Sequence, residues 1–405
     1  MKFPFLCTFS LLTACHVFSA DWPKFGGLMG NFASSETGLR KIWDADEPVK
    51  VWHAEVGLGF SSVVEANGHA YTQGYSNGKN TIFCFQAETG KVVWKKQYPS
   101  PLGDNFFKGG SRATPVIKNE NLYLLSHSGD FYSMNAKNGK INWSLNLIKD
   151  LRGIRPTWGY AGSPLVTDDS IVINTGALKS SLVALDPVDG EVLWRNGIYK
   201  ASYSTPVKRQ KYNQCLLFHG EGLTIHNLEN GDELASYQHK TRYGINASQP
   251  LEIADRILVS SAYGKGSALV DFSSNSPKVL WKTEKVSSQI ASQVLNEGFV
   301  FGIHGQAGSS SRFATLFCLD VEKGRVLWQK KGFGLGSVIL VDKTLVVLSE
   351  EGELALVEAN SVKYKELARF QILSGKENWI PPTFSNGRLY CRSSDGILVC
   401  LKMMK

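Results

Sequence analysis

A repeat that ends in tryptophan constrains the fold of this chain more than any other feature. Five segments share an ending in which a turn leads into a short apolar strand and then tryptophan: residues 86–94, 135–143, 186–194, 271–281 and 320–328. Residues 227–237 and 358–370 are degenerate copies that end in another aromatic residue, and Trp52 closes one more unit. The eight closing aromatics lie 42 to 51 residues apart, which is the length of a four-stranded propeller blade.

The two ends of the chain complement each other. Within each unit, Asn, Asp and Gly separate four short strands, and a glycine that tolerates positive φ recurs in the third hairpin. After Phe370 only three strands remain, at 382–384, 388–392 and 397–401, and residues 49–54 supply the missing outer strand. Sharing one blade between both ends leaves no sheet edge open. We therefore predict an all-β fold, an eight-bladed β-propeller of four-stranded antiparallel blades whose last blade is closed by the N-terminal strand.

The repeat A-x-x-G-K-x-x-W, present at residues 87–94, resembles that of quinoprotein (PQQ-like) repeat propellers. This class includes pyrroloquinoline-quinone (PQQ) dehydrogenases and the outer-membrane assembly lipoprotein BamB. Residues 21–27 and 36–39 also resemble the leader of secreted propellers from planctomycete-type bacteria. The resemblance covers nearly all of residues 49–401. It implies that the repeat tryptophans are packing elements between blades rather than a cofactor box: Trp52, Trp94, Trp143, Trp194, Trp281 and Trp328.

The N-terminus has the layout of an export signal, with Lys2 followed by an apolar stretch over residues 3–14. Small residues before Ala20 and Asp21 favour cleavage there, whereas residues 12–15 resemble a lipobox that would leave a lipid anchor on Cys15. We expect a signal peptide at 1–20, a leader at 21–48, the propeller at 49–401 and a tail at 402–405. The predicted product is a monomer in the periplasm or cell envelope, where nucleic acid is not an expected partner.

No catalytic constellation stands out in the sequence. A quinone-dependent dehydrogenase needs calcium held by clustered oxygens, and many members have two adjacent cysteines over the cofactor. This chain has no adjacent cysteine pair, and the carboxylates near the expected channel mouth are dispersed: Asp104, Asp150, Glu284 and Glu377. The G-x-S-x-G at residues 74–78 joins two strands instead of a strand and a helix. We therefore expect no cofactor, and we retain PQQ with calcium, acting in an alcohol or sugar dehydrogenase, as the alternative.

Histidines and cysteines offer two further candidate sites. His127, His219 and His304 occupy matching positions on alternate blades, which places them too far apart to share a zinc ion. We therefore predict no metal site. Cys391 and Cys400 would face each other across a two-residue turn at Asp395-Gly396, and a disulfide between them is left open.

Charge is unevenly distributed over the predicted fold. Seven segments that connect outer strands to the next inner strands, on the face around the channel mouth, carry a net charge of +12, and other loops there sum to about −2. Such a field attracts anionic partners. Candidate contact residues at the mouth are cations, aromatics and amides: Arg112, Arg155, Trp158, Tyr160, Tyr203, Arg242, Asn246, Gln249, Gln293 and Trp379. The favoured hypothesis is an exported, non-catalytic binding or scaffold propeller whose basic face holds an anionic or peptide partner.

Overall fold

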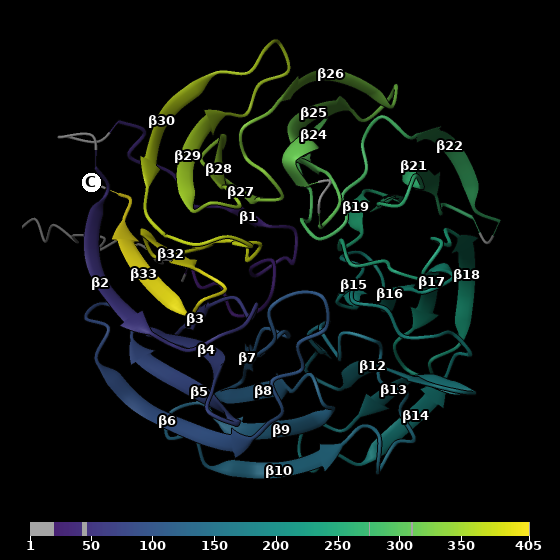
Figure 1. Cartoon of the computed structure of the whole chain (residues 1–405). Helices are drawn as coiled ribbons and strands as arrows, with labels where there is room; N and C mark the ends of the chain where they lie inside the picture. Colours follow the sequence, from purple (N-terminus) through teal and green to yellow (C-terminus); the bar gives the residue numbers. More distant parts are fainter. Residues whose placement is uncertain (1–19, 43–46, 275, 309–310, 405) are drawn as a thin grey trace, which may run out of the picture.

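The computed structural model describes residues 20–42, 47–274, 276–308 and 311–404. Within them, eight four-stranded blades of sequential antiparallel strands form a closed ring (Figure 1), which confirms the predicted fold. No helix in the described part of the chain is long and apolar enough to cross a membrane. The predicted signal-peptide cleavage and the lipidation of Cys15 concern residues 1–19, which lie outside the described residues.

The first four blades follow one another along the chain. Blade 1 contains β3 (Val64–Ala66), β4 (His69–Ser76), β5 (Lys79–Gln86) and β6 (Val92–Pro99), and blade 2 contains β7 (Val116–Lys118), β8 (Asn121–Leu125), β9 (Asp130–Asn135) and β10 (Ile141–Asn146). Blade 3 contains β11 (Leu165–Val166), β12 (Ile171–Ala177), β13 (Ser180–Leu185) and β14 (Val192–Asn196), and blade 4 contains β15 (Val207–Lys208), β16 (Gln214–His219), β17 (Gly222–Asn227) and β18 (Glu233–Gln238).

The remaining blades complete the ring. Blade 5 contains β19 (Leu251–Ile253), β20 (Arg256–Ser261), β21 (Gly266–Asp271) and β22 (Lys278–Thr283), and blade 6 contains β23 (Val294–Asn296), β24 (Phe299–His304), β25 (Thr315–Asp320) and β26 (Arg325–Lys330), with the 3-10 turn η2 (Ser311–Phe313) in its middle hairpin. Blade 7 contains β27 (Ser337–Val341), β28 (Thr344–Leu348), β29 (Glu353–Glu358) and β30 (Glu366–Gln371). Blade 8 contains β31 (Thr383–Ser385), β32 (Arg388–Arg392), β33 (Ile397–Lys402) and β2 (Val49–Glu55).

Strand β2 closes the ring as the sequence predicts. It pairs antiparallel with β33 from Val49 opposite Lys402 to Glu55 opposite Ile397, and it lies on the outside of blade 8 in Figure 1. The closure is reinforced by Arg392 of β32, whose buried guanidinium donates to two carbonyl oxygens at 2.5 and 2.7 Å. These belong to Ser61, in the connection between β2 and β3, and to Gln73 of β4 in blade 1. The first and last parts of the chain are thereby joined by main-chain and side-chain hydrogen bonds.

Each repeat tryptophan docks onto the blade that follows it. The Trp52 indole nitrogen donates to the Ala87 carbonyl at 2.9 Å, and Trp94 makes the same bond to Ala136 at 2.8 Å. The ring lies on the turn glycine of the next blade, because a Cβ added at Gly90 would meet the Trp52 ring at 2.5 Å. Corresponding indole bonds are made by Trp143, Trp194, Trp281 and Trp328. The repeat therefore encodes blade-to-blade packing.

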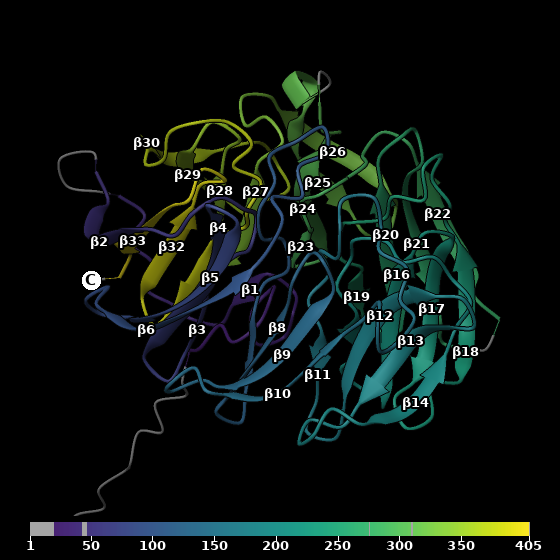
Figure 2. The same cartoon turned by 60° about the horizontal axis from the view of Figure 1, so that its bottom comes forward.

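The N-terminal leader crosses the face of the ring opposite the channel mouth. Trp22 exchanges two main-chain hydrogen bonds with Glu65 of blade 1, and β1 (Ala33–Ser34) pairs in parallel with β27 of blade 7. Arg40 then donates its amide to the Met403 carbonyl. Figure 2 shows β1 near the middle of the molecule, below the hairpin that carries η2. This short segment thus ties several blades together from beneath.

The structure answers the question that the sequence left open for Cys391 and Cys400. Residues 393–396 form a four-residue connection, which shifts the register by one so that Cys391 faces Val399 and Cys400 faces Tyr390. A one-residue shift sends neighbouring side chains to opposite faces of a sheet. Both thiols are buried and free, so the disulfide does not form. Cys400 instead pairs with Trp52 of β2, where a small side chain leaves room for the indole.

Candidate functional site

A cavity of about 180 Å³ lies at the centre of the ring and is open on the mouth face, the side that carries the loops from each outer strand to the next inner strand. Its walls come mainly from those loops, with further residues from the start of β27 and from the middle hairpins of blades 5 and 6. Aromatic side chains dominate the lining: Phe25, Phe32, Phe60, Phe107, Trp158, Tyr203, Tyr263 and Trp379. A concave, mostly apolar site with a few polar groups is the usual form of a small-ligand pocket.

The leader forms the floor of this cavity. Phe25 and Phe32 line it from the leader side and contact each other edge-to-face, with ring centroids 5.0 Å apart. Gly26, at φ +79°, lets the chain bend tightly enough for the two rings to meet. The bend is held by a hydrogen bond from the Phe32 amide to the Gly26 carbonyl at 2.8 Å. The channel of the propeller is therefore a blind pocket.

Two aromatic clusters form the rim. On one side, Trp379 stacks on Phe60 at 5.5 Å and meets Phe107 edge-on at 5.2 Å. On the other, Trp158 contacts Tyr203 at 5.7 Å and Phe106 at 6.3 Å, and its indole donates to the Asn105 carbonyl. Phe106 is 87% exposed and has a positive φ of 67°, which is unusual for a bulky residue. A large apolar side chain is thus held out at the mouth at some conformational cost.

Arg112 is the one cation among the described residues that line the cavity. Its Cζ lies 5.4 Å from the centre of the Phe60 ring, and one terminal nitrogen reaches the carbonyls of Gly103 and Lys108 at 3.4 and 3.3 Å. The Nε atom is buried without a hydrogen-bond partner. Burial lowers the pKa of this guanidinium, which is the expected effect of removing a cation from water.

Six of the ten predicted mouth residues lie at the mouth. Trp158, Tyr203, Trp379 and Arg112 line the cavity. Arg155 and Arg242 are exposed on the loops around it, and Arg242 lies over the ring of Tyr243 at 5.3 Å. Neither exposed arginine forms a salt bridge with a described residue, so both are available to a partner.

The other four predicted residues are buried within the protein. The Tyr160 hydroxyl donates to the Thr175 carbonyl at 2.9 Å, and the Asn246 amide donates to the carbonyls of His219 and His239. Gln249 donates to the Gly30 carbonyl of the leader, on the side away from the mouth, and Gln293 donates to Ser288. All four side chains therefore hold loops in place beneath the mouth.

Four further aromatic residues line the cavity although no sequence pattern predicts them there: Phe25, Phe32, Phe60 and Tyr263. Phe60 follows β2 in the Gly57–Phe60 connection, which carries no repeat signature. Tyr263 lies in the middle hairpin of blade 5 with φ +60°, and its hydroxyl accepts a hydrogen bond from Gln289 at 2.9 Å. The available signal was the concentration of aromatics in segments without strand alternation.

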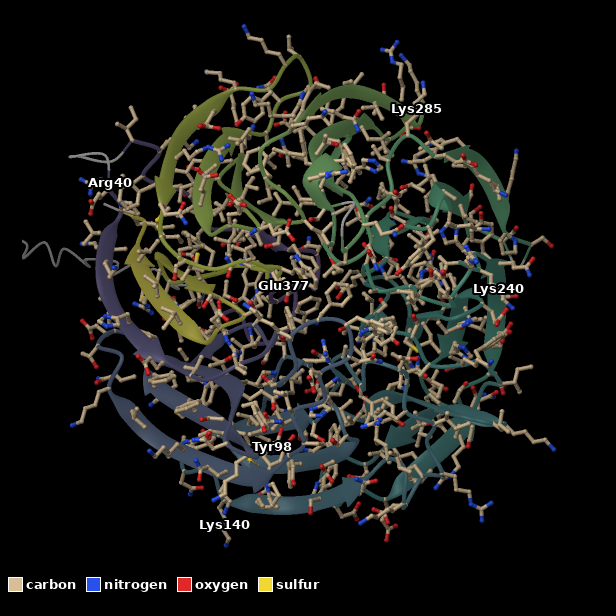
Figure 3. All side chains as sticks on the ribbon, in the orientation of Figure 1. Arg40, Tyr98, Lys140, Lys240, Lys285 and Glu377 are labelled. Atoms are coloured by element: carbon tan, nitrogen blue, oxygen red, sulfur yellow. The ribbon has the colours of Figure 1, made fainter. Side chains whose placement is uncertain are left out.

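The basic charge at the mouth is smaller than the sequence count. Five counted cations belong to outer strands rather than loops: Lys95, Lys96, Arg195, Lys282 and Lys330. Removing them leaves the loops at net +7. Lys108 is paired with Asp395 at 2.6 Å, and Lys240 is paired with Glu221 at 2.8 Å. Figure 3 shows Lys240 at the outer edge of the ring and Glu377 near its centre. The cationic character therefore rests mainly on a few loop residues.

The three matching histidines do not form a metal site. No group of three or more His, Cys, Asp or Glu residues in the described ranges could hold a metal ion. The His219 ring accepts a hydrogen bond from the Glu221 amide, and the His304 ring accepts one from the Ser287 amide. Burial lowers the pKa of His127 to about 4 and that of His219 to about 3, so these imidazoles are neutral at pH 7.

The cavity does not fit a calcium-dependent quinone. Calcium needs six to eight oxygen ligands with carboxylates among them, and no carboxylate is present among the described residues of the lining. Glu350, close to the rim, already accepts hydrogen bonds from the Trp379 indole and the Leu335 amide at 3.0 and 3.1 Å. The carboxylate ligands that calcium would need beside a bound quinone are thus missing from the described lining of the cavity.

The repeat is specific enough to assign the family. The family model described as outer membrane protein assembly factor BamB matches residues 35–214 and 105–330. The chain belongs to this family. Curated relatives include BamB of Kangiella koreensis, 24% identical over 51% of this chain and 49% of the relative, and BamB of Shewanella oneidensis, 23% identical over 57% and 56%. The matches thus span about half the length of these relatives.

Solved structures with the same fold extend over most of the chain. BamB from Moraxella catarrhalis superposes with a TM-score of 0.65 at 15% identity, covering 88% of this chain and 98% of that one. Quinohemoprotein alcohol dehydrogenase from Comamonas testosteroni superposes with a TM-score of 0.69 at 13% identity, covering 94% and 80%. At these identities the likeness concerns the fold, which enzymes and assembly factors share.

Proposed function

We propose that this chain is an exported, BamB-like scaffold of the cell envelope that binds a protein partner through its mouth face and catalyses no reaction. The observation that carries the proposal is the mouth itself. Its loops carry exposed cations, Arg155 and Arg242, and exposed aromatic side chains, Phe106 and Tyr243. Arginines and aromatics supply most of the binding energy in protein interfaces, and surface charge speeds encounter with a partner of opposite sign.

Family membership supports the same proposal. The curated relatives carry the name outer membrane protein assembly factor, and a role in assembling envelope proteins is consistent with a rigid ring that presents loops on one face. The expected partner segment is acidic and contains apolar residues, because the face offers both cations and aromatic rings. The predicted export signal and the alternative lipid anchor at Cys15 would place the scaffold in the periplasm or at a membrane.

Charge reversal at the mouth tests this proposal. The double variant Arg155→Glu and Arg242→Glu should lower partner capture from envelope extracts at least about tenfold while thermal stability stays unchanged, because both side chains are exposed and outside ion pairs. Lys140→Glu is the matched control, since this exposed lysine lies in a hairpin between the third and fourth strands of blade 2, on the leader side. Equal capture by the double variant and the control would contradict the proposal.

Quinone titration tests the alternative. A PQQ-dependent dehydrogenase should bind the quinone with calcium at micromolar concentration and then reduce a dye with alcohols or sugars as substrates. We expect neither result, because the cavity lining supplies no carboxylate within the described residues. Tight, calcium-dependent quinone binding would replace the scaffold proposal with an enzymatic one.

A further inference from the structure

The blind central cavity combines an aromatic lining with a single incompletely bonded cation. The space of about 180 Å³ compares with the roughly 150 Å³ engineered cavity that binds benzene. Aromatic rings wall it on several sides, and the Phe25–Phe32 pair closes its far end. Its size and surface therefore suit one aromatic ring with a short substituent.

Arg112 gives this cavity its polarity. The guanidinium is flanked by Phe60, its Nε has no partner, and its bonds to the Gly103 and Lys108 carbonyls are long, at 3.4 and 3.3 Å. Both bonds come from one terminal nitrogen. An anionic ligand in the cavity would give the terminal nitrogens shorter, charge-assisted hydrogen bonds. The planar guanidinium matches a carboxylate or a phosphate by paired hydrogen bonds.

The surroundings distinguish between these two anions. No second cation lines the cavity within the described residues, and the nearby ammonium of Lys108 is already paired with Asp395 at 2.6 Å. Glu377 already interacts electrostatically with Arg112, so the net positive charge beside the cavity is small. A dianionic phosphate would therefore leave more uncompensated charge in this apolar pocket than a monoanionic carboxylate would. Opposite, the Tyr263–Gln289 pair, bonded at 2.9 Å, offers a polar contact for the far end of a ligand.

We propose that the central cavity is a binding site for a small aromatic carboxylate, whose ring lies between the rim aromatics and the Phe25–Phe32 floor and whose carboxylate pairs with Arg112. This site goes beyond the partner-binding face, because Arg155 and Arg242 do not line the cavity. Either proposal can therefore fail while the other stands.

Calorimetric titration with 3-phenylpropionate and its neutral amide tests the proposal on the unmodified protein. We expect the acid to bind with a dissociation constant of about 0.1–1 mM, the scale for a ligand of about a dozen non-hydrogen atoms. The amide should bind at least about tenfold more weakly, because it lacks the charge-assisted pair with Arg112. Equal binding of acid and amide, or no binding of the acid up to about 10 mM, would overturn the proposal.

Variants locate the site. Arg112→Gln should weaken the acid at least about tenfold and leave the amide unchanged. Ala247→Phe, which adds a ring to the cavity lining, should block both ligands and does not depend on the arginine. Lys285→Gln, which removes an exposed cation from the β22–β23 loop of the same face, should change neither affinity more than about twofold. Wild-type affinity for the acid in a folded Ala247→Phe protein would show that the ligand binds elsewhere and overturn the proposal.

Discussion

Removing the indole of Trp52 tests how the ring is closed. This side chain is 7% exposed, contacts Phe85 and Tyr390 at centroid distances of 5.6 and 5.7 Å, and donates to the Ala87 carbonyl at 2.9 Å. Truncating a buried tryptophan to alanine costs about 3–5 kcal/mol, and the lost hydrogen bond adds about 1 kcal/mol. Trp52→Ala should therefore lower the free energy of unfolding by about 4–6 kcal/mol.

Urea denaturation followed by intrinsic fluorescence and circular dichroism measures this loss. Trp52→Phe keeps most of the packing and removes the donor, so it should cost only about 1–2 kcal/mol. Val51→Ala is the matched control on the same strand, because Val51 is 41% exposed and should cost less than about 1 kcal/mol. A loss below about 1.5 kcal/mol for Trp52→Ala, or equal losses for the alanine and phenylalanine variants, would refute the docking role.

Three further predictions concern buried polar groups. Glu65 accepts hydrogen bonds from Arg388 at 2.5 Å and from the Tyr390 hydroxyl at 2.6 Å. Glu65→Gln should therefore lower the free energy of unfolding by about 3 kcal/mol in a thermal melt, and an unchanged melting temperature would contradict this. Arg392→Leu should destabilise by about 2–4 kcal/mol, because two oxygens of β4 and two of the β2–β3 connection lose their donor; a more stable variant would contradict this. Burial lowers the pKa of His239 to about 3, so between pH 6.5 and 3 the unfolded chain binds a proton that the folded protein does not. The free energy of unfolding is therefore highest above pH 6.5 and decreases as the pH falls toward 3. His239→Phe should make the melting temperature less dependent on pH between 6.5 and 4, and an unchanged pH profile would exclude this histidine as a cause.

The fold could be predicted from the repeat because the same residues make the same packing contact in successive blades. Trp94 and Gly139, for example, are adjacent only through blade packing, where a Cβ at Gly139 would meet the Trp94 ring at 2.7 Å. The same contact recurs between Trp143 and Gly190. Because this packing contact recurs around the ring, tryptophan and glycine recur at regular intervals in the sequence. The number of strands left at the two termini then indicates how the ring closes.

Side chains outside the repeat were harder to place. Asn246 and Gln249 were expected at the mouth, yet both point into the protein, because a loop has no periodicity that fixes the direction of its side chains. The register around Cys391 depends on whether the hairpin connection has two residues or four, and Asp395-Gly396 is compatible with both. The floor formed by Phe25 and Phe32 depends on contacts with distant blades, which composition does not reveal.

Site-specific photo-crosslinking in the native host tests the central claim, that the mouth face binds a protein partner. A photoreactive residue would replace Arg155 or Arg242 on the mouth face, or Lys140 on the opposite side as a control. The proposed scaffold predicts one discrete protein adduct from both mouth positions and none from position 140. An adduct that forms from position 140 and not from the two mouth positions would contradict the account.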